Sequence, residues 1–81
     1  LSIFPNPATD FIAVQSSGML REKIDIRLTD LSGKLVQTAE IQPGSTISYF
    51  DCRSLYDGIY VVSVSKNGVT VVAEKVVVRR D

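Results

Sequence analysis

The sequence predicts an all-β fold, and two observations carry this prediction. Val and Ile supply 18 of the 81 residues, and β-branched side chains favour strands over helices. Turn signals such as Asp57-Gly58 and Asn67-Gly68 recur at a spacing of roughly 8–14 residues. This spacing suits a sandwich of short strands and leaves little room for a helix.

Seven candidate strands lie between these turns. Residues 1–4 precede two prolines that cannot both donate to a ladder, so this strand is expected at a sheet edge. Residues 23–29 show the clearest period of two, with Ile24, Ile26 and Leu28 facing one side. The other candidates are residues 11–15, 34–41, 46–52, 59–66 and 69–79. Seven such strands predict an immunoglobulin-like antiparallel β-sandwich, with an expected core of Ile26, Leu28, Leu35, Phe50, Leu55, Tyr60, Val62 and Val64.

The Asn67-Gly68 pair predicts a two-residue type I′ hairpin loop, because both central positions need a positive φ. Counting from this loop gives three pairs: Lys66 with Val69, Val64 with Val71, and Tyr60 with Lys75. The last pair would bring a charge to the apolar face. We therefore expect either a bulge near Glu74-Lys75 or a strand end that leaves the core. In both cases the last strand is Val-rich on two faces, and an uncovered edge there would favour association.

The composition excludes several functions. Nine Lys and Arg residues balance nine Asp and Glu residues, so no net field attracts nucleic acid or an anionic membrane. The chain lacks His, the commonest general base and metal ligand, and its single Cys52 cannot form an internal disulfide. No run approaches the roughly 20 apolar residues that span a bilayer. We expect no catalytic residue, no cofactor, no metal site and no membrane insertion.

The N-terminal residues lack the charged start and the apolar stretch of a secretory signal, and the chain does not begin with Met. We interpret residues 1–81 as one domain that is a fragment of a larger protein.

Four segments resemble the type A C-terminal sorting domains of the type IX secretion system. They are Phe4-Pro5-Asn6-Pro7-Ala8-Thr9-Asp10, residues 26–36 around Asp30 and Gly33, residues 55–62 around Leu55, Gly58 and Tyr60, and the close Lys75-Val76-Val77-Val78-Arg79. Together they cover nearly the whole chain in the family's order. Two positions depart from the pattern: Tyr56 stands where a small residue or Pro is common, and Cys52 where a large aliphatic residue is common.

The resemblance implies a non-catalytic β-sandwich at the C-terminus of a large exported protein of Bacteroidetes-type bacteria. Such a domain directs a folded N-terminal passenger across the outer membrane, and a cell-surface peptidase commonly removes it. The released passenger is often joined to an anionic lipopolysaccharide. The implied partners are the secretion translocon and the outer-membrane shuttle and sortase proteins. The implied location is the periplasm in transit, then the outer-membrane surface or the medium.

The resemblance also implies which residues matter. The translocon would recognise the final region: Lys75, Val76, Val77, Val78, Arg79 and Arg80. The motif positions with a structural role are Pro5, Asn6, Pro7, Asp30, Gly33, Leu55, Gly58 and Tyr60.

Each candidate also has a simpler interpretation. Cys52 is a redox or acylation site, or else a small buried hydrophobe. Tyr60 contacts a ligand, or else is a tyrosine corner whose hydroxyl bonds an upstream backbone group. Three aspartates, at positions 30, 51 and 57, bind calcium, or else bond their own turns. The segment Pro5-Asn6-Pro7 is an epitope, or else a rigid start of the domain. The basic close is an ordinary last strand, or else a signal offered to a partner by edge addition.

Two functions therefore compete. The first is a secretion-sorting module, and the alternative is an accessory adhesion or ligand-binding sandwich of a surface enzyme. A catalytic domain ranks below both, because no nucleophile–base pair exists.

Overall fold

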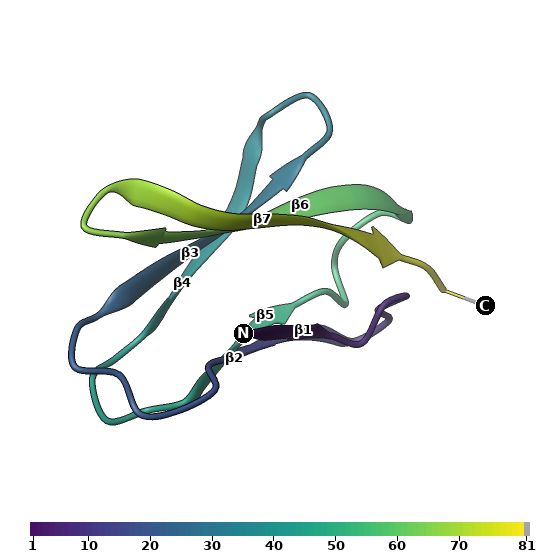
Figure 1. Ribbon diagram of the computed structural model, residues 1–81. Helices are drawn as coiled ribbons and strands as arrows, with labels where there is room; N and C mark the ends of the chain where they lie inside the picture. The colour runs from purple at the N-terminus through teal and green to yellow at the C-terminus, as the bar shows by residue number, and fades with distance from the viewer. Residues whose placement is uncertain (81) are drawn as a thin grey trace.

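The computed structural model describes residues 1–80, and these residues form seven β-strands in two antiparallel sheets without a helix (Figure 1). The three-stranded sheet has the order β1 (Ser2–Phe4), β2 (Phe11–Gln15), β5 (Ile47–Asp51). The four-stranded sheet has the order β4 (Leu35–Ile41), β3 (Ile24–Asp30), β6 (Gly58–Lys66), β7 (Val69–Val78). The predicted seven-stranded sandwich is confirmed, and β1 lies at a sheet edge as expected.

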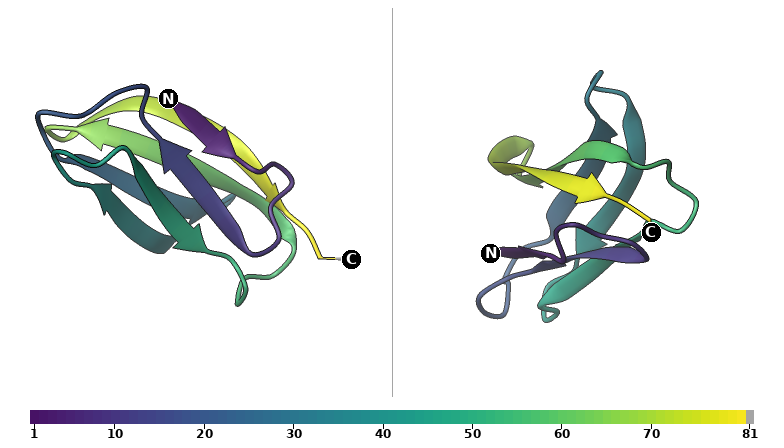
Figure 2. Two further views of the ribbon diagram at one scale, coloured as in Figure 1. Left: turned by 90° about the horizontal axis from the view of Figure 1, so that it is seen from below. Right: turned by 90° about the vertical axis from the view of Figure 1, so that its right-hand side faces the viewer.

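The two sheets face each other, and the core lies between them (Figure 2). Ile12 and Phe50 are directly paired neighbours on β2 and β5, and both are fully buried. Leu28 and Val62 pair in the same way across β3 and β6. Alternate residues of each strand point inward because successive side chains of a strand point to opposite faces. The period of two in β3 therefore identified its buried face correctly.

Most of the expected core is buried, but Leu35 is not. Its side chain is 51% exposed, so its assignment to the core is wrong. The pairing of β3 with β4 shifts between Leu28 and Thr29, which leaves one extra residue in β4. This irregularity reverses the alternation, so that Val36 packs against the core in place of Leu35. Leu55 is partly buried against the core, and the other expected members are buried: Ile26, Leu28, Phe50, Tyr60, Val62 and Val64.

The β6–β7 hairpin has the predicted loop but not the predicted register. Asn67 and Gly68 have φ values of 52° and 77°, as a type I′ loop requires. The expected bulge is present, but it lies between the pairs Ser65–Thr70 and Val64–Val72. Its predicted position near Glu74-Lys75 is therefore wrong. The early shift leaves Val71 without a paired residue on β6. It also moves each later residue of β7 to the opposite face from the one that the count from the loop predicted.

The corrected phase brings the end of β7 into the core. Tyr60 pairs with Val76 and Gly58 with Val78, and both valines are fully buried. The outward face of the same stretch carries Val77 opposite Ile59 and Lys75 opposite Val61. Within residues 1–80 no helix is long and apolar enough to cross a membrane.

Two leucines allow a matched test of this core. Leu28→Ala should lower the free energy of unfolding by roughly 2–5 kcal/mol, because it leaves a cavity at a fully buried position. Leu35→Ala should change it by no more than about 0.5–1 kcal/mol, because half of that side chain is already in water. Urea unfolding followed by circular dichroism measures both. Equal losses for the two variants would contradict the shifted register of β4.

Candidate functional site

The basic close of the chain divides into exposed and buried residues. Val76 and Val78 lie in the core, whereas Lys75 and Arg79 are exposed and Val77 is half-buried on the outward face. While the domain is folded, a partner can contact the two cations but not the two buried valines. The six residues assigned to recognition therefore do not form one accessible segment.

The segment that follows β1 covers the edge of β7. The backbone N–H of Ala8 donates to the carbonyl of Val77 at 2.7 Å, and the N–H of Arg79 donates to the carbonyl of Ala8 at 2.9 Å. This pair of bonds forms a short parallel bridge between Ala8 and Val78. The Thr9 hydroxyl adds a bond of 3.0 Å to the carbonyl of Arg79.

Asn6 extends this cover with its side chain. Its Oδ1 accepts the N–H of Val77 at 3.0 Å, and its Nδ2 donates to the carbonyl of Lys75 at 3.4 Å. One amide side chain thus supplies the acceptor and the donor that a neighbouring strand would supply. The flanking prolines have no N–H to offer, and both of their preceding peptide bonds are cis. Pro5-Asn6-Pro7 is therefore an edge cap for β7, and a partner strand could add at Lys75–Val77 only by displacing it.

Arg80 is held by the loop between β5 and β6. Its guanidinium donates to the carbonyls of Leu55 and Cys52, and it forms an ion pair of 3.5 Å with Asp57. The carboxylate of Asp57 also accepts the backbone N–H of Arg80 at about 3.2 Å. Arg80 therefore ties the chain end to the sandwich, which leaves Lys75 and Arg79 as the exposed cations of the close.

The motif residues near that loop have structural contacts. The Tyr60 hydroxyl donates to the carbonyl of Tyr56 at 2.7 Å, so the tyrosine-corner interpretation is confirmed. Gly58 is the first residue of β6, the strand that carries Tyr60. The side chain of Tyr56 itself is almost fully exposed.

The turn between β3 and β4 is closed by Asp30. Its Oδ1 accepts the Ser32 hydroxyl at 2.7 Å and the backbone N–H groups of Ser32 and Lys34 at 2.9 and 3.0 Å. The bond from the Ser32 hydroxyl, followed by those from the backbone, lowers the pKa of Asp30 below its ordinary value. Gly33 has a φ of 89°, which non-glycine residues rarely adopt. The turn interpretation of Asp30 and Gly33 is confirmed.

Asp51 is the last residue of β5 and Cys52 directly follows it, but the two side chains have different environments. Asp51 accepts two bonds from the Arg53 guanidinium, at 3.0 and 2.8 Å, and one from its backbone N–H at 3.0 Å. The guanidinium bonds are the main reason why the pKa of Asp51 falls to about 2. Cys52 is fully buried, and burial raises the pKa of its thiol. Its interpretation as a small buried hydrophobe is confirmed.

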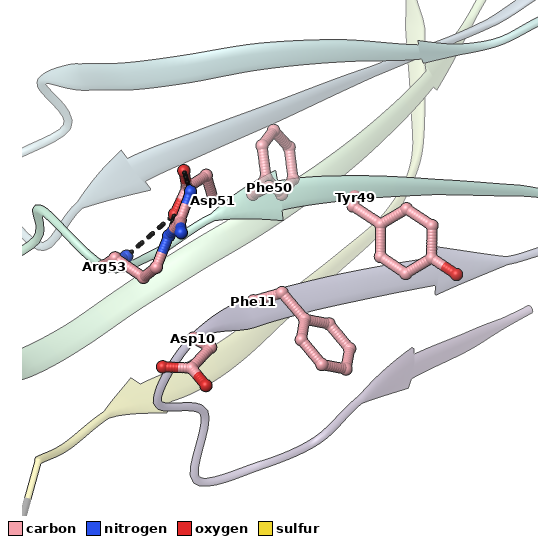
Figure 3. Close-up of a pocket in the computed structure, with 6 residues that line it drawn as sticks. All are labelled: Asp10, Phe11, Tyr49, Phe50, Asp51 and Arg53. Atoms are coloured by element: carbon pink, nitrogen blue, oxygen red, sulfur yellow. Dashed lines mark hydrogen bonds and ion pairs between the residues drawn. The ribbon is translucent and has the colours of Figure 1, made fainter.

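The outer face of the three-stranded sheet carries an open depression near this ion pair (Figure 3). The rings of Phe11 and Tyr49 meet edge to face, with 5.6 Å between their centroids. Together with Phe4 they surround Ala13, which is fully buried although it lies on the outer face. The rings thus cover the sheet itself, in the way that cross-strand aromatic pairs stabilise small sheets. Sequence reasoning did not single out this cluster.

The structure also joins two candidates that were considered separately, the Pro5-Asn6-Pro7 segment and the basic close. The sequence signal for this contact is the amide residue between two prolines. Since the prolines have no N–H, Asn6 makes the strand-like bonds through its side chain.

Asp30, Asp51 and Asp57 bond their own turns or nearby arginines. No group of three His, Cys, Asp or Glu side chains in residues 1–80 is arranged to hold a metal ion.

These features define a class of protein: a small β-sandwich module whose last strand is capped by its own N-terminal segment and displays basic residues. Residues 2–79 match the family described as the secretion system C-terminal sorting domain, and the chain belongs to this family. The match confirms the resemblance to type IX sorting domains. A comparison with curated proteins gives no match. The family implies a type IX signal for export across the outer membrane, with an N-terminal passenger and the secretion machinery as partners. A sorting tail of this kind is not catalytic.

The cap can be tested with Asn6→Ala. Losing two bonds to β7 should lower the free energy of unfolding by about 0.5–1.5 kcal/mol and speed the exchange of the Val77 amide proton. Native-state hydrogen exchange read by NMR measures this. Gln42→Ala is the matched control, because within residues 1–80 the side-chain amide of Gln42 bonds only the exposed carboxylate of Glu40. If the Val77 amide were equally protected in both variants, Asn6 would not cap the strand.

The ion pair beside β5 predicts a pH dependence. The pKa of Asp51 falls from 3.8 to about 2 in the folded protein, so its stabilising effect is present above about pH 4 and is lost as the pH falls towards 2. Asp51→Asn should therefore flatten the loss of stability over this window, and Arg53→Gln should do the same because it removes the partner. Urea unfolding across this pH range measures the effect. If both variants lost stability towards pH 2 as steeply as the parent does, the Asp51–Arg53 ion pair would not be the cause of this pH dependence.

Proposed function

We propose that this domain is a non-catalytic sorting signal that the type IX machinery reads in its folded form. The single observation that carries the proposal is the family match over residues 2–79. The exposed Lys75 and Arg79 support it, because Lys75 lies on β7 and Arg79 directly follows it, and the backbone edge of this strand is already occupied. A partner would therefore recognise side chains rather than a free strand.

The residues of the close then have different roles. Lys75 and Arg79 contact the translocon, with Val77 between them. Val76 and Val78 fix the strand by burial, and Arg80 fixes the chain end on the loop at Leu55. This division explains how one short segment can be required both for folding and for recognition.

The finer steps of export follow from the same proposal. The passenger crosses the periplasm, the translocon and the outer-membrane shuttle and sortase proteins handle it in turn, and it ends attached to the cell surface or released. An accessory ligand-binding module remains the second candidate function. The exposed Phe11–Tyr49 pair beside the Asp51–Arg53 ion pair is the observation that favours it.

The proposal predicts the effect of Lys75→Glu combined with Arg79→Glu in the full-length precursor. Both side chains are exposed, so the free energy of unfolding should change by only about 0.5 kcal/mol. Folded, active passenger should accumulate in the periplasm, as measured by cell fractionation and a passenger assay.

A matched control reverses two other exposed cations, Arg21 and Lys66, at the hairpin end of the sandwich. This variant carries the same net charge and should be exported normally. Normal arrival at the surface of the Lys75/Arg79 variant, and of a precursor without residues 1–81, would contradict the sorting function and favour the ligand-binding candidate.

A further inference from the structure

The outer face of the four-stranded sheet carries an apolar strip that no other strand of residues 1–80 covers. Ile59 on β6 pairs with Val77 on β7, and the next row pairs Val61 with Lys75. Directly paired residues lie on the same face, so Ile59, Val61 and Val77 form one continuous strip. Ile59 is 43% exposed and the two valines are half-buried. The other sheet lies against the opposite, inner face (Figure 2).

Cations surround this strip. Lys75 stands at the β7 end of the Val61 row, and Arg79 is the exposed residue that directly follows β7. Arg27 on β3 pairs with Ser63, one row further along the same face. All three are exposed, and within residues 1–80 none of them forms an ion pair.

The acidic residues of this face are separated from the strip and already partnered. Asp25 and Glu40 pair with each other across β3 and β4, and the ammonium of Lys23 lies 3.6 and 2.9 Å from their carboxylates. Although the chain has no net charge, this half of the face presents unpaired positive charge around an apolar centre.

The backbone edge beside the strip offers no alternative mode of recognition. Asn6 and Ala8 already use the outward polar groups of β7 from Lys75 to Val77. A partner that approaches this end of the domain must therefore meet the sheet face. Because the unpaired cations around the strip would repel a basic partner, the complementary surface is acidic with an apolar centre.

We infer that this basic and apolar face, made of Arg27, Ile59, Val61, Lys75, Val77 and Arg79, is the surface that docks onto an acidic, apolar-centred patch of a secretion-machinery protein. The inference rests on the proposed sorting function and deepens it. The signal is a folded surface drawn from β3, β6 and β7, and not only the linear sequence at the end of the chain.

The decisive variant leaves the last strand unchanged. In the full-length precursor, Arg27→Glu with Ile59→Thr alters the face from β3 and β6 alone, and Thr keeps the β-branched shape that suits a strand. The fraction of passenger at the cell surface should fall about tenfold or more, with folded passenger in the periplasm. Arg21→Glu with Met19→Thr is the matched control, because it makes the same charge reversal and likewise replaces an apolar side chain by Thr, at exposed positions outside the sheets. Both variants should keep the urea midpoint of the parent.

A photo-reactive residue at position 59 identifies the occupant. It should cross-link the precursor to a machinery protein, and the cross-link should weaken with added salt and in the Lys75→Glu, Arg79→Glu variant. The same probe at position 49, on the opposite sheet, should give no such product. Binding of the precursor to phosphatidylglycerol vesicles that disappears in the Arg27/Ile59 variant would show a lipid surface as the occupant and overturn the inference.

The docking face and the sorting function can be contradicted separately. If the Lys75/Arg79 variant is retained but the Arg27/Ile59 variant is exported normally, the folded-face inference is wrong and the sorting function stands. If both variants and the precursor without residues 1–81 reach the surface normally, the sorting function itself is wrong.

Discussion

The bonds between the segment after β1 and the edge of β7 are the constraint on which this domain depends. They join residues that lie about 70 positions apart, Asn6 with Val77 and Thr9 with Arg79. They also connect the two sheets, since Ala8 lies between β1 and β2 of the three-stranded sheet and Val78 ends the last strand of the four-stranded one. Without them a Val-rich edge strand would expose a row of unpaired backbone groups, which is the common route to unwanted strand pairing.

The same constraint separates folding from recognition within a few residues. Because the edge is closed, β7 keeps a fixed orientation, with Val76 and Val78 inward and Lys75 and Val77 outward. Arg80 then anchors the chain end through its bonds to the β5–β6 loop. A substitution in this stretch therefore acts on stability if it points inward and on the surface if it points outward. Loss of export after deletion of the whole stretch could not distinguish these two effects.

Much of the fold could be predicted because it rests on local patterns. The alternation in β3 and the positive φ values of the Asn67-Gly68 loop depend only on neighbouring residues. The two bulges could not be placed in this way, because each depends on how a strand pairs with a partner and where the pairing shifts. They account for the wrong assignment of Leu35 and for the wrong register after Ser65. The role of Asn6 was hidden for the same reason, since its partners lie at the other end of the chain.

The sequence identified the basic residues of the candidate site, but not which of them are free to contact a partner. The sequence places Lys75, Arg79 and Arg80 together, but the three differ once the chain folds, because within residues 1–80 only the Arg80 side chain bonds carbonyl and carboxylate groups. Conversely, the linear sequence does not single out Arg27 and Ile59 as site residues, yet the pairing of β3, β6 and β7 brings them to the same face as Lys75. A closed edge beside an open, unpaired basic face favours a partner that reads side chains in three dimensions. Such a signal exists only while the domain is folded, so the fold itself becomes a condition for recognition.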